Sequence, residues 1–278
     1  MTRRRFLKGA AALTGGTLCA GIYAWQIEPH WLEIVSRPLP IRALPKALQG
    51  KRLVQLSDIH VGARVSDNYV LETFAQVALL QPDIVVLTGD LTSYHSHIQD
   101  HVKRIYSHLP HGRLATLAIL GNHEYGHGWS DYRAADRMVI TLRELGVQVL
   151  RNEMVNVSGL QIIGMDDLWA HRFDPKKALA DVDVTRAMLA LSHNPDTVDL
   201  PGWERFNGWI LSGHTHGGQC RPPFLPPPLL PVKNRSYTAG EFELTNERKL
   251  YINRGVGHLI EVRFNVRPEV TSFELQTL

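Results

Sequence analysis

Apolar and polar positions alternate in blocks along the middle of this chain. Five short apolar runs each end directly in a polar segment that contains Asp, Asn or His. Runs of this length and composition are typical of strands that are buried on both faces of a sheet. We therefore predict five buried strands, over residues 51–56, 83–87, 114–120, 187–191 and 208–211.

Helical periodicity separates several of these strands. Ser66 can cap a helix over residues 66–80, which Pro82 ends. Residues 97–109 and 131–144 also have the pattern of helices. Strands that alternate with helices predict a layered α/β protein.

The last part of the chain changes character and has short apolar segments between turn residues. This spacing predicts strands that complete a second sheet, and it does not indicate a separate domain. We predict these strands at residues 237–244, 250–253, 259–265 and 270–275.

The polar segments follow the carboxyl ends of the predicted strands, where open α/β sheets form their binding crevices. Each segment also has a small residue that allows a tight turn, such as Gly121 or Gly213. Five such segments predict a single site where imidazole, carboxylate and amide groups meet. The candidate site residues are Asp58, His60, Asp90, Asn122, His123, His193, His214 and His216.

Composition narrows the chemistry of this site. The chain has 278 residues, of which 44% are hydrophobic and 21% charged, the balance of a globular protein. Its formal net charge is +3, but four positive charges lie at residues 3–5 and Lys8, so the rest of the chain is nearly neutral. A nearly neutral body lacks the basic surface that binds phosphate backbones, and we therefore expect no nucleic-acid partner. The two cysteines, Cys19 and Cys220, form no CxxC pair. Mixed imidazole and carboxylate ligands suit Mn²⁺, Zn²⁺ or Fe.

The N-terminus is typical of an export signal. Basic residues at positions 3–8 precede an apolar stretch, and residues 1–25 contain no acid. The motif Thr-Arg-Arg-Arg-Phe-Leu-Lys resembles the bacterial twin-arginine signal, which implies the twin-arginine export machinery as a partner. We expect residues 1–25 to be a signal or a membrane anchor, residues 26–49 to connect, and residues 50–278 to form the catalytic domain. The protein would then be periplasmic or anchored to the outer face of the cytoplasmic membrane.

The candidate residues occur in motifs that resemble those of the calcineurin-like metallophosphoesterases. The resemblance covers residues 50–275 and depends on the order and strand context of all the motifs together. The leader and the segments 28–31, 217–219 and 253–255 resemble the bacterial twin-arginine-exported phosphodiesterases of that superfamily. The motifs are D-x-H at Asp58 and His60, G-D at Asp90, G-N-H-E at Asn122 and His123, a later His193, and G-H-x-H at His214 and His216.

The resemblance implies a four-layer α/β/β/α sandwich of two mixed sheets that holds two divalent metal ions. It implies hydrolysis of phosphodiester bonds, and of some phosphomonoesters, by a hydroxide between the two ions. His123 would protonate the leaving oxygen or stabilise charge on the phosphoryl group. The implied ligands are Asp58, His60 and His216 for one ion, Asn122, His193 and His214 for the other, and Asp90 as the bridge.

Two departures from the superfamily pattern bear on the activity. The residues after Asp90 lack the Asp-Arg pair of the phosphoprotein phosphatases, which disfavours protein dephosphorylation. Glu124 stands where many bacterial relatives have Asp, and we expect little effect because this side chain is not a ligand.

The sequence leaves several alternatives open. Arg254 is either a contact to substrate phosphate or part of a structural salt bridge, and Asp166 and Asp167 either orient ligands or form a plain turn. The proline-rich segment 221–231 is either a stiff loop or an apolar surface for a membrane or a lipid-linked substrate. The activity is that of a phosphodiesterase or, alternatively, of a UDP-2,3-diacylglucosamine-type pyrophosphatase that acts on a nucleotide-linked lipid. The complete ligand set disfavours a binding module with an inactive site.

Overall fold

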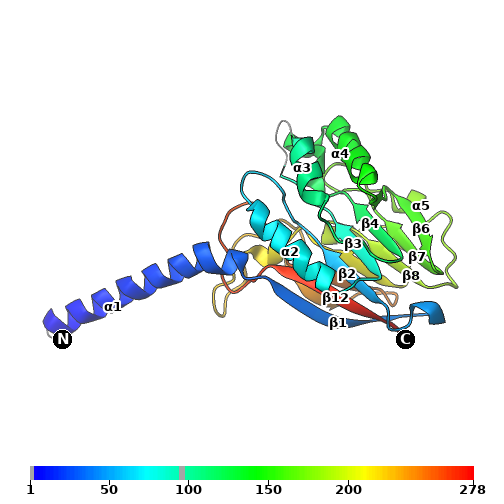
Figure 1. Cartoon of the computed structure of the whole chain (residues 1–278). Helices are drawn as coiled ribbons and strands as arrows, with labels where there is room; N and C mark the ends of the chain where they lie inside the picture. The colour runs from blue at the N-terminus through cyan, green and yellow to red at the C-terminus, as the bar shows by residue number, and fades with distance from the viewer. Residues whose placement is uncertain (1–2, 94–97) are drawn as a thin grey trace.

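Two six-stranded sheets pack face to face in the computed structural model, which describes residues 3–93 and 98–278 (Figure 1). The first sheet has the order β1 (Glu33–Ile41), β12 (Glu269–Thr277), β2 (Arg52–Leu56), β3 (Ile84–Thr88), β4 (Ala115–Ile119) and β5 (Gln148–Val149). The second has the order β10 (Gly240–Glu243), β11 (Lys249–Ile252), β9 (Trp209–Ser212), β8 (Met188–Leu191), β7 (Leu160–Gly164) and β6 (Glu153–Val157).

Both sheets are mixed, and helices cover their outer faces. Strands β2 to β5 are parallel, whereas β12 runs antiparallel to β2. In the second sheet β7, β8, β9 and β11 are parallel, and the outer strands β6 and β10 are antiparallel to their neighbours. The first sheet is covered by α2 (Asp67–Leu79), α3 (Ile98–Tyr106) and α4 (Tyr132–Glu144), and the second by α5 (Pro175–Ala178) with adjoining loops. The predicted four-layer α/β/β/α sandwich is confirmed.

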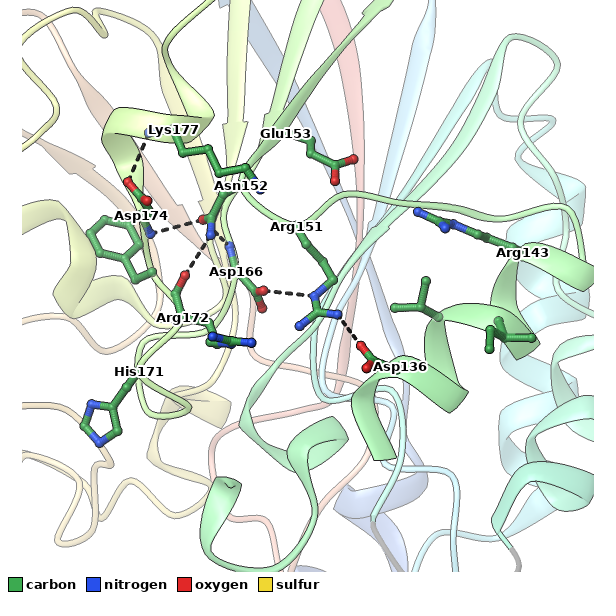
Figure 2. A pocket seen from close by; sticks show the side chains of 13 residues that line it. Asp136, Arg143, Arg151, Asn152, Glu153, Asp166, His171, Arg172, Asp174 and Lys177 are labelled. Carbon is green, nitrogen blue, oxygen red and sulfur yellow. Dashed lines mark hydrogen bonds and ion pairs between the residues drawn. The ribbon is translucent and has the colours of Figure 1, made fainter. Parts of the chain in front are cut away.

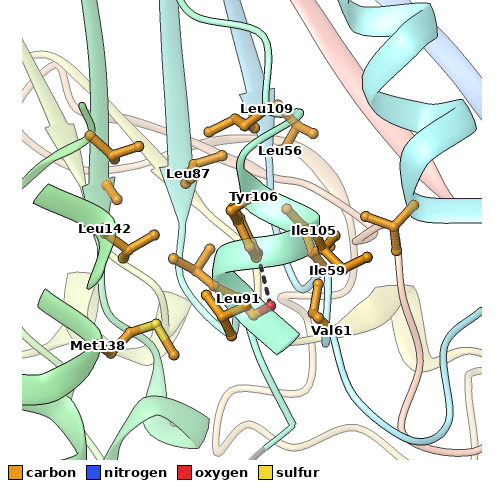
Figure 3. Close-up of a cluster of buried hydrophobic side chains, with 14 of the residues drawn as sticks. Leu56, Ile59, Val61, Leu87, Leu91, Ile105, Tyr106, Leu109, Met138 and Leu142 are labelled. Carbon is orange, nitrogen blue, oxygen red and sulfur yellow. Dashed lines mark hydrogen bonds between the residues drawn. The ribbon is translucent and has the colours of Figure 1, made fainter. Parts of the chain in front are cut away.

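The central strands are apolar throughout because each of their faces lies in a different core. On β3, Ile84 belongs to the core between the two sheets, whereas Val85 belongs to the core under the helices. On β8, Leu189 likewise faces the first sheet and Met188 faces α5. Successive side chains of a strand point to opposite faces, so a strand between two cores has no polar side. Figure 3 shows the helix-side core, where Tyr106 of α3 also donates a hydrogen bond of 2.8 Å to the Leu91 carbonyl.

Three features of the fold differ from the sequence prediction. The segment 26–49, expected only to connect, contains β1, which pairs in parallel with β12 over nine residues. Residues 259–265 form no strand, and only an isolated bridge joins Phe264 to Cys220. The last strand, β12, lies in the first sheet and not in the second. The predicted helix 97–109 is described from Ile98 onward, and residue 97 lies outside the described residues.

The N-terminal helix α1 (Arg3–Ile22) extends away from the sandwich (Figure 1). The residues that directly follow α1 contact the sandwich. The Arg263 amide donates to the Ala24 carbonyl at 2.8 Å, and the Tyr23 ring packs edge-on against the Phe264 ring. Among residues 3–93 and 98–278, no helix has both the length and the apolar character needed to span a bilayer.

Candidate metal centre

The carboxyl ends of strands from both sheets bring the seven predicted ligands together. Asp58 and His60 follow β2, Asp90 follows β3 and Asn122 follows β4, while His193 follows β8 and the last two histidines, His214 and His216, follow β9. The groups Asp58–His60–His216 and Asp90–His193–His214 each have ligand atoms within 4.8 Å of one another. All seven side chains are buried.

The closest contacts in this centre are between atoms that are all potential ligands. The Nε2 atoms of His60 and His216 lie 3.2 Å apart, and His193 Nε2 lies 3.2 Å from both Asp90 Oδ2 and His214 Nδ1. Asp90 Oδ2 is also 3.7 Å from His60 Nε2, so this carboxylate stands between the two groups.

The donor set fits divalent cations. Oxygen and imidazole ligands without thiolates suit Mn²⁺, Zn²⁺ or Fe. Asn122 Oδ1 is buried and has no hydrogen-bond partner among the described residues. A buried amide oxygen without a partner is costly, and coordination of a cation would satisfy it.

The backbone of the loops that carry the predicted ligands adopts a left-handed conformation, which residues with a side chain rarely adopt. Five of the seven predicted ligands have positive φ, which is uncommon for residues other than glycine. They are Asp58 at 50°, His60 at 53°, Asp90 at 51°, His214 at 69° and His216 at 49°. Hydrogen bonds between the loops hold this geometry, for example from the His60 amide to the Asp90 carbonyl at 3.0 Å. Strain of this kind is typical of functional sites.

For three of the four predicted histidine ligands, hydrogen bonds outside the centre fix which ring nitrogen faces it. His193 Nδ1 donates to the Thr88 carbonyl at 2.8 Å, and His60 Nδ1 lies 3.3 Å from the Ser93 hydroxyl. His214 instead donates from Nε2 to the Pro231 carbonyl at 2.9 Å. Metal-binding histidines commonly use their second nitrogen in this way, which orients the ring.

Burial and charge set the protonation of the ligands. Burial lowers the pKa of His60 and of His214 to about 3, so both rings are neutral and can act as ligands. Burial also opposes protonation of His193, but the adjacent Asp90 raises its pKa to about 10. Burial raises the pKa of Asp58 to about 6. The centre therefore favours positive charge beside Asp90, as a divalent cation would supply.

Glu124 has a structural role that the sequence analysis missed. Its buried carboxylate accepts hydrogen bonds from the backbone amides of Gly121 at 2.7 Å and of Asp90 and Thr92 at 3.0 Å each. It therefore ties the loop after β3 to the loop after β4. Sequence spacing could not indicate this role, because the three donors belong to two loops that meet only in the fold.

Asp166 also supports the site from outside the predicted ligand set, whereas Asp167 accepts the amide of Ala170 at 2.7 Å within a local turn. Asp166 accepts hydrogen bonds from the Tyr125 hydroxyl and, at 2.9 Å, from Arg151, which also binds Asp136. Figure 2 shows this carboxylate on the wall of a polar pocket of about 760 Å³. Because Tyr125 ends the short helical turn Asn122–Tyr125, Asp166 fixes the turn that carries one ligand and His123.

His123 and Arg254, the two residues predicted to contact substrate, differ in position. His123 is half-buried, its amide donates to Asp90 Oδ1 at 3.0 Å, and its ring meets the His60 ring edge-on with centroids 4.9 Å apart. Arg254 makes ion pairs with Glu269 and, at 2.8 Å, with Glu33. The structural salt bridge is therefore present, and a contact of Arg254 with phosphate stays a prediction.

Two clefts open beside the metal centre. One is an apolar pocket of about 460 Å³, whose outer wall is formed by Pro228, Leu229, Ile260 and Val262. The other, of about 700 Å³, lies beyond Trp169 and is lined by both aromatic and polar residues. Trp169 lines both clefts, and no motif or spacing in the sequence indicates its position.

The fold and the convergent Asp, Asn and His side chains define a protein with a metal centre between two sheets, of the kind used for hydrolysis at phosphorus. Residues 51–218, more than half of the chain, match the model of the calcineurin-like phosphoesterases. The chain belongs to this family and is a metallophosphoesterase, as its motifs predicted.

Similar proteins align with nearly the whole chain. The metallophosphoesterase YkuE of Bacillus subtilis (strain 168) is 33% identical, over 100% of this chain and 98% of its own length. The phosphodiesterase YaeI of Escherichia coli (strain K12) is 31% identical over 99% of each chain. The UDP-2,3-diacylglucosamine pyrophosphatase LpxG of Chlamydia trachomatis serovar D is 28% identical, over 94% of this chain and 96% of its own.

Proposed function

We propose that this protein is a phosphodiesterase, with some phosphomonoesterase activity, that uses two divalent ions of Mn²⁺, Zn²⁺ or Fe. The observation that carries the proposal is that six of the predicted ligands, all buried, form the groups Asp58–His60–His216 and Asp90–His193–His214, and that Asp90 also lies 3.7 Å from His60. The similarity to a protein named phosphodiesterase, over nearly its full length, supports the same activity.

The residues of the chain have separable tasks in this reaction. Bound divalent cations supply Lewis acidity, which offsets phosphoryl charge and activates water. Both carboxylate oxygens of Asp58 accept the His214 amide at 3.0 Å, so the first loop positions the last one. Asp90, whose Oδ2 lies between His60 and His193, would hold both cations. The His123 ring, which lines the apolar pocket, protonates the leaving oxygen.

A second candidate is hydrolysis of a nucleotide-linked lipid of the UDP-2,3-diacylglucosamine type. The apolar pocket beside the ligands favours it, because Leu229 and Ile260 offer exposed apolar surface next to the centre. The similarity to LpxG supports the same class of substrate.

We also propose that the protein is exported by the twin-arginine machinery and works at the outer face of the membrane. The basic start and apolar stretch of the leader support export. Phe224 and Leu225, exposed on the proline-rich loop, support contact with a membrane surface. Cell fractionation with N-terminal sequencing tests the location, and a cytosolic protein that begins at Met1 would contradict export. Phe224→Ser with Leu225→Ser is expected to reduce sedimentation with lipid vesicles.

The activity is tested with protein that has been stripped by a chelator and reloaded with Mn²⁺, Zn²⁺ or Fe²⁺. We expect release of p-nitrophenol from bis-p-nitrophenyl phosphate, and slower release from the monoester p-nitrophenyl phosphate. His216→Ala should be inactive, whereas His108→Ala, which changes an exposed histidine, should be fully active. Hydrolysis of UDP-2,3-diacylglucosamine alone would favour the second candidate. A folded protein that is inert on all three compounds with every metal would refute both.

A further inference from the structure

Two tryptophans form a ledge that begins at a metal ligand and ends in solvent. The edge of Trp169 meets the His214 ring at 89°, with centroids 4.4 Å apart. Trp129 lies against Trp169, also with centroids 4.4 Å apart and with a tilt of 39°. We call Trp129 and Trp169 the indole ledge. Trp169 is half-buried, whereas 37% of Trp129 is exposed.

The backbone under the ledge is strained at its exposed end. Trp129 has a φ of 56°, a conformation that is a clear outlier for a bulky side chain. Gly126 and Gly128 before it also have positive φ, at 70° and 66°. Full burial of the side chain does not offset this backbone strain, because the indole is still partly exposed to solvent. Strain that persists for an exposed side chain beside a metal centre indicates a ligand-binding role.

The cleft that the indole ledge lines also contains polar side chains that can form hydrogen bonds with a ligand. Lys233 lines it, and its amide is anchored by Asp196 at 2.7 Å. Within the part of the chain that the structure describes, the Lys233 ammonium group makes no ion pair, so it can donate to a ligand. Asn234 also lines the cleft. The apolar pocket on the other side of Trp169 lacks such a cation.

We propose that the indole ledge binds an aromatic nucleobase on one ester group of the substrate, with Lys233 donating a hydrogen bond to a base carbonyl. The proposal depends on the proposed function, because the base must be attached to the phosphodiester at the metal centre. A planar base has a face that stacks on indole and an edge that accepts hydrogen bonds. A hydrocarbon chain has no such edge, and the apolar pocket suits it better.

The test compares two diesters that release the same product, thymidine 5′-p-nitrophenyl phosphate and methyl p-nitrophenyl phosphate. Stacking on an aromatic side chain accounts for a factor of about 5–150 in binding. Trp129→Ala should therefore raise the KM of the thymidine ester by about that factor and leave the methyl ester unchanged. Trp129→Phe should keep most of the preference. Trp25→Ala, which removes an exposed tryptophan outside the clefts, should change neither.

Equal effects of Trp129→Ala on both esters, or a wild-type protein without preference for the thymidine ester, would overturn the proposal. If neither diester is hydrolysed, the proposed function fails and the ledge is tested separately. Calorimetry then compares thymidine 5′-monophosphate binding to Mn²⁺-loaded wild type and Trp129→Ala. A dissociation constant weaker in the variant by about the same factor supports the ledge, and equal constants overturn it.

Discussion

At the scale of single residues, His123 stands apart from the other histidines of the centre because its ring is half-buried where it lines the apolar pocket. The four histidines that are predicted ligands are fully buried. We predict that His123→Ala keeps both metals and lowers kcat by about 10²–10⁴-fold, the range of general acid catalysis. Metal content by mass spectrometry and kcat with bis-p-nitrophenyl phosphate measure the two effects.

The control for His123→Ala is His108→Ala, because His108 is exposed. Its metal content and kcat should equal those of the wild type. Full activity of His123→Ala would exclude the role in proton donation. Loss of metal together with activity would make His123 a ligand, as its position near His60 and Asp90 also allows.

His258 is a buried histidine outside the ligand set, and it gives the protein a predictable pH dependence. Its Nε2 donates to the Arg64 carbonyl at 3.1 Å, and its buried Nδ1 has no partner among the described residues. Burial lowers its pKa from 6.5 to about 4; Arg263 and His30 nearby also lower it, while the Arg64 carbonyl and Glu261 raise it. Between these two values the unfolded chain binds a proton that the folded chain does not.

Stability from His258 is therefore full above pH 6.5 and is lost as the pH falls toward 4. The shift corresponds to at most about 3 kcal/mol. His258→Gln keeps a donor for the Arg64 carbonyl and removes the titration. We predict that the difference in unfolding free energy between wild type and variant shrinks by up to that amount from pH 7 to pH 4, measured by urea unfolding. Parallel curves for the two proteins would contradict this.

The residues that the sequence could identify are those that directly follow a buried strand. Asp58, Asp90 and Asn122 lie at such ends, so strand prediction alone indicates where they meet. Glu124, Trp129 and Trp169 act through neighbours from other loops, and no spacing in the sequence marks them.

At the scale of elements, Arg254 joins three strands. It follows β11 and pairs with Glu33 at the start of β1 and with Glu269 at the start of β12. These two glutamates are register partners, so their carboxylates are neighbours on adjacent strands. Glu269 also accepts hydrogen bonds of 2.6 Å from Tyr251 and Thr271.

We predict that Arg254→Ala destabilises the protein by about 3 kcal/mol, because it leaves a buried carboxylate without its cation. For a domain of this size, that corresponds to a fall in Tm of roughly 5–10 °C. Arg42→Ala is the matched control, since Arg42 and Glu247 form an exposed pair that should contribute little. If Arg254→Ala instead keeps the wild-type Tm and raises KM, Arg254 contacts phosphate and the salt bridge is incidental.

Helices and strands could be predicted where the apolar periodicity of one continuous segment is sufficient to identify the element. The five buried strands and the helices after β2 and before β5 have complete periodic patterns. Strand β1 contains Pro38 and Pro40 and lies at the edge of its sheet, where proline is tolerated, so its sequence does not resemble a strand. The sheet to which β12 belongs depends on pairing with β1 and β2, which are distant in the sequence.

At the scale of the whole molecule, the centre exists only when the two sheets are packed. Asp58, Asp90 and Asn122 come from the first sheet, and His193 and His216 from the second. A polar contact inside the intervening core supports this packing, since Gln55 on β2 donates to the Ser212 carbonyl on β9 at 3.0 Å. Bound cations would therefore cross-link the sheets, and metal affinity would contribute directly to the stability of the sandwich.

We predict that Mn²⁺ or Zn²⁺ at 100 times its dissociation constant stabilises the protein by about 2.7 kcal/mol for each site. The Tm of chelator-treated protein should then rise by roughly 5–10 °C on reloading, measured by scanning calorimetry. Because each group of predicted ligands comes from both sheets, His216→Ala should lose much of this rise, and His108→Ala should keep all of it. Since the cross-link is a property of the packed sandwich, the rise should appear in a single transition of the entire domain. A Tm that does not respond to metal in the wild type would mean that the seven side chains do not bind cations.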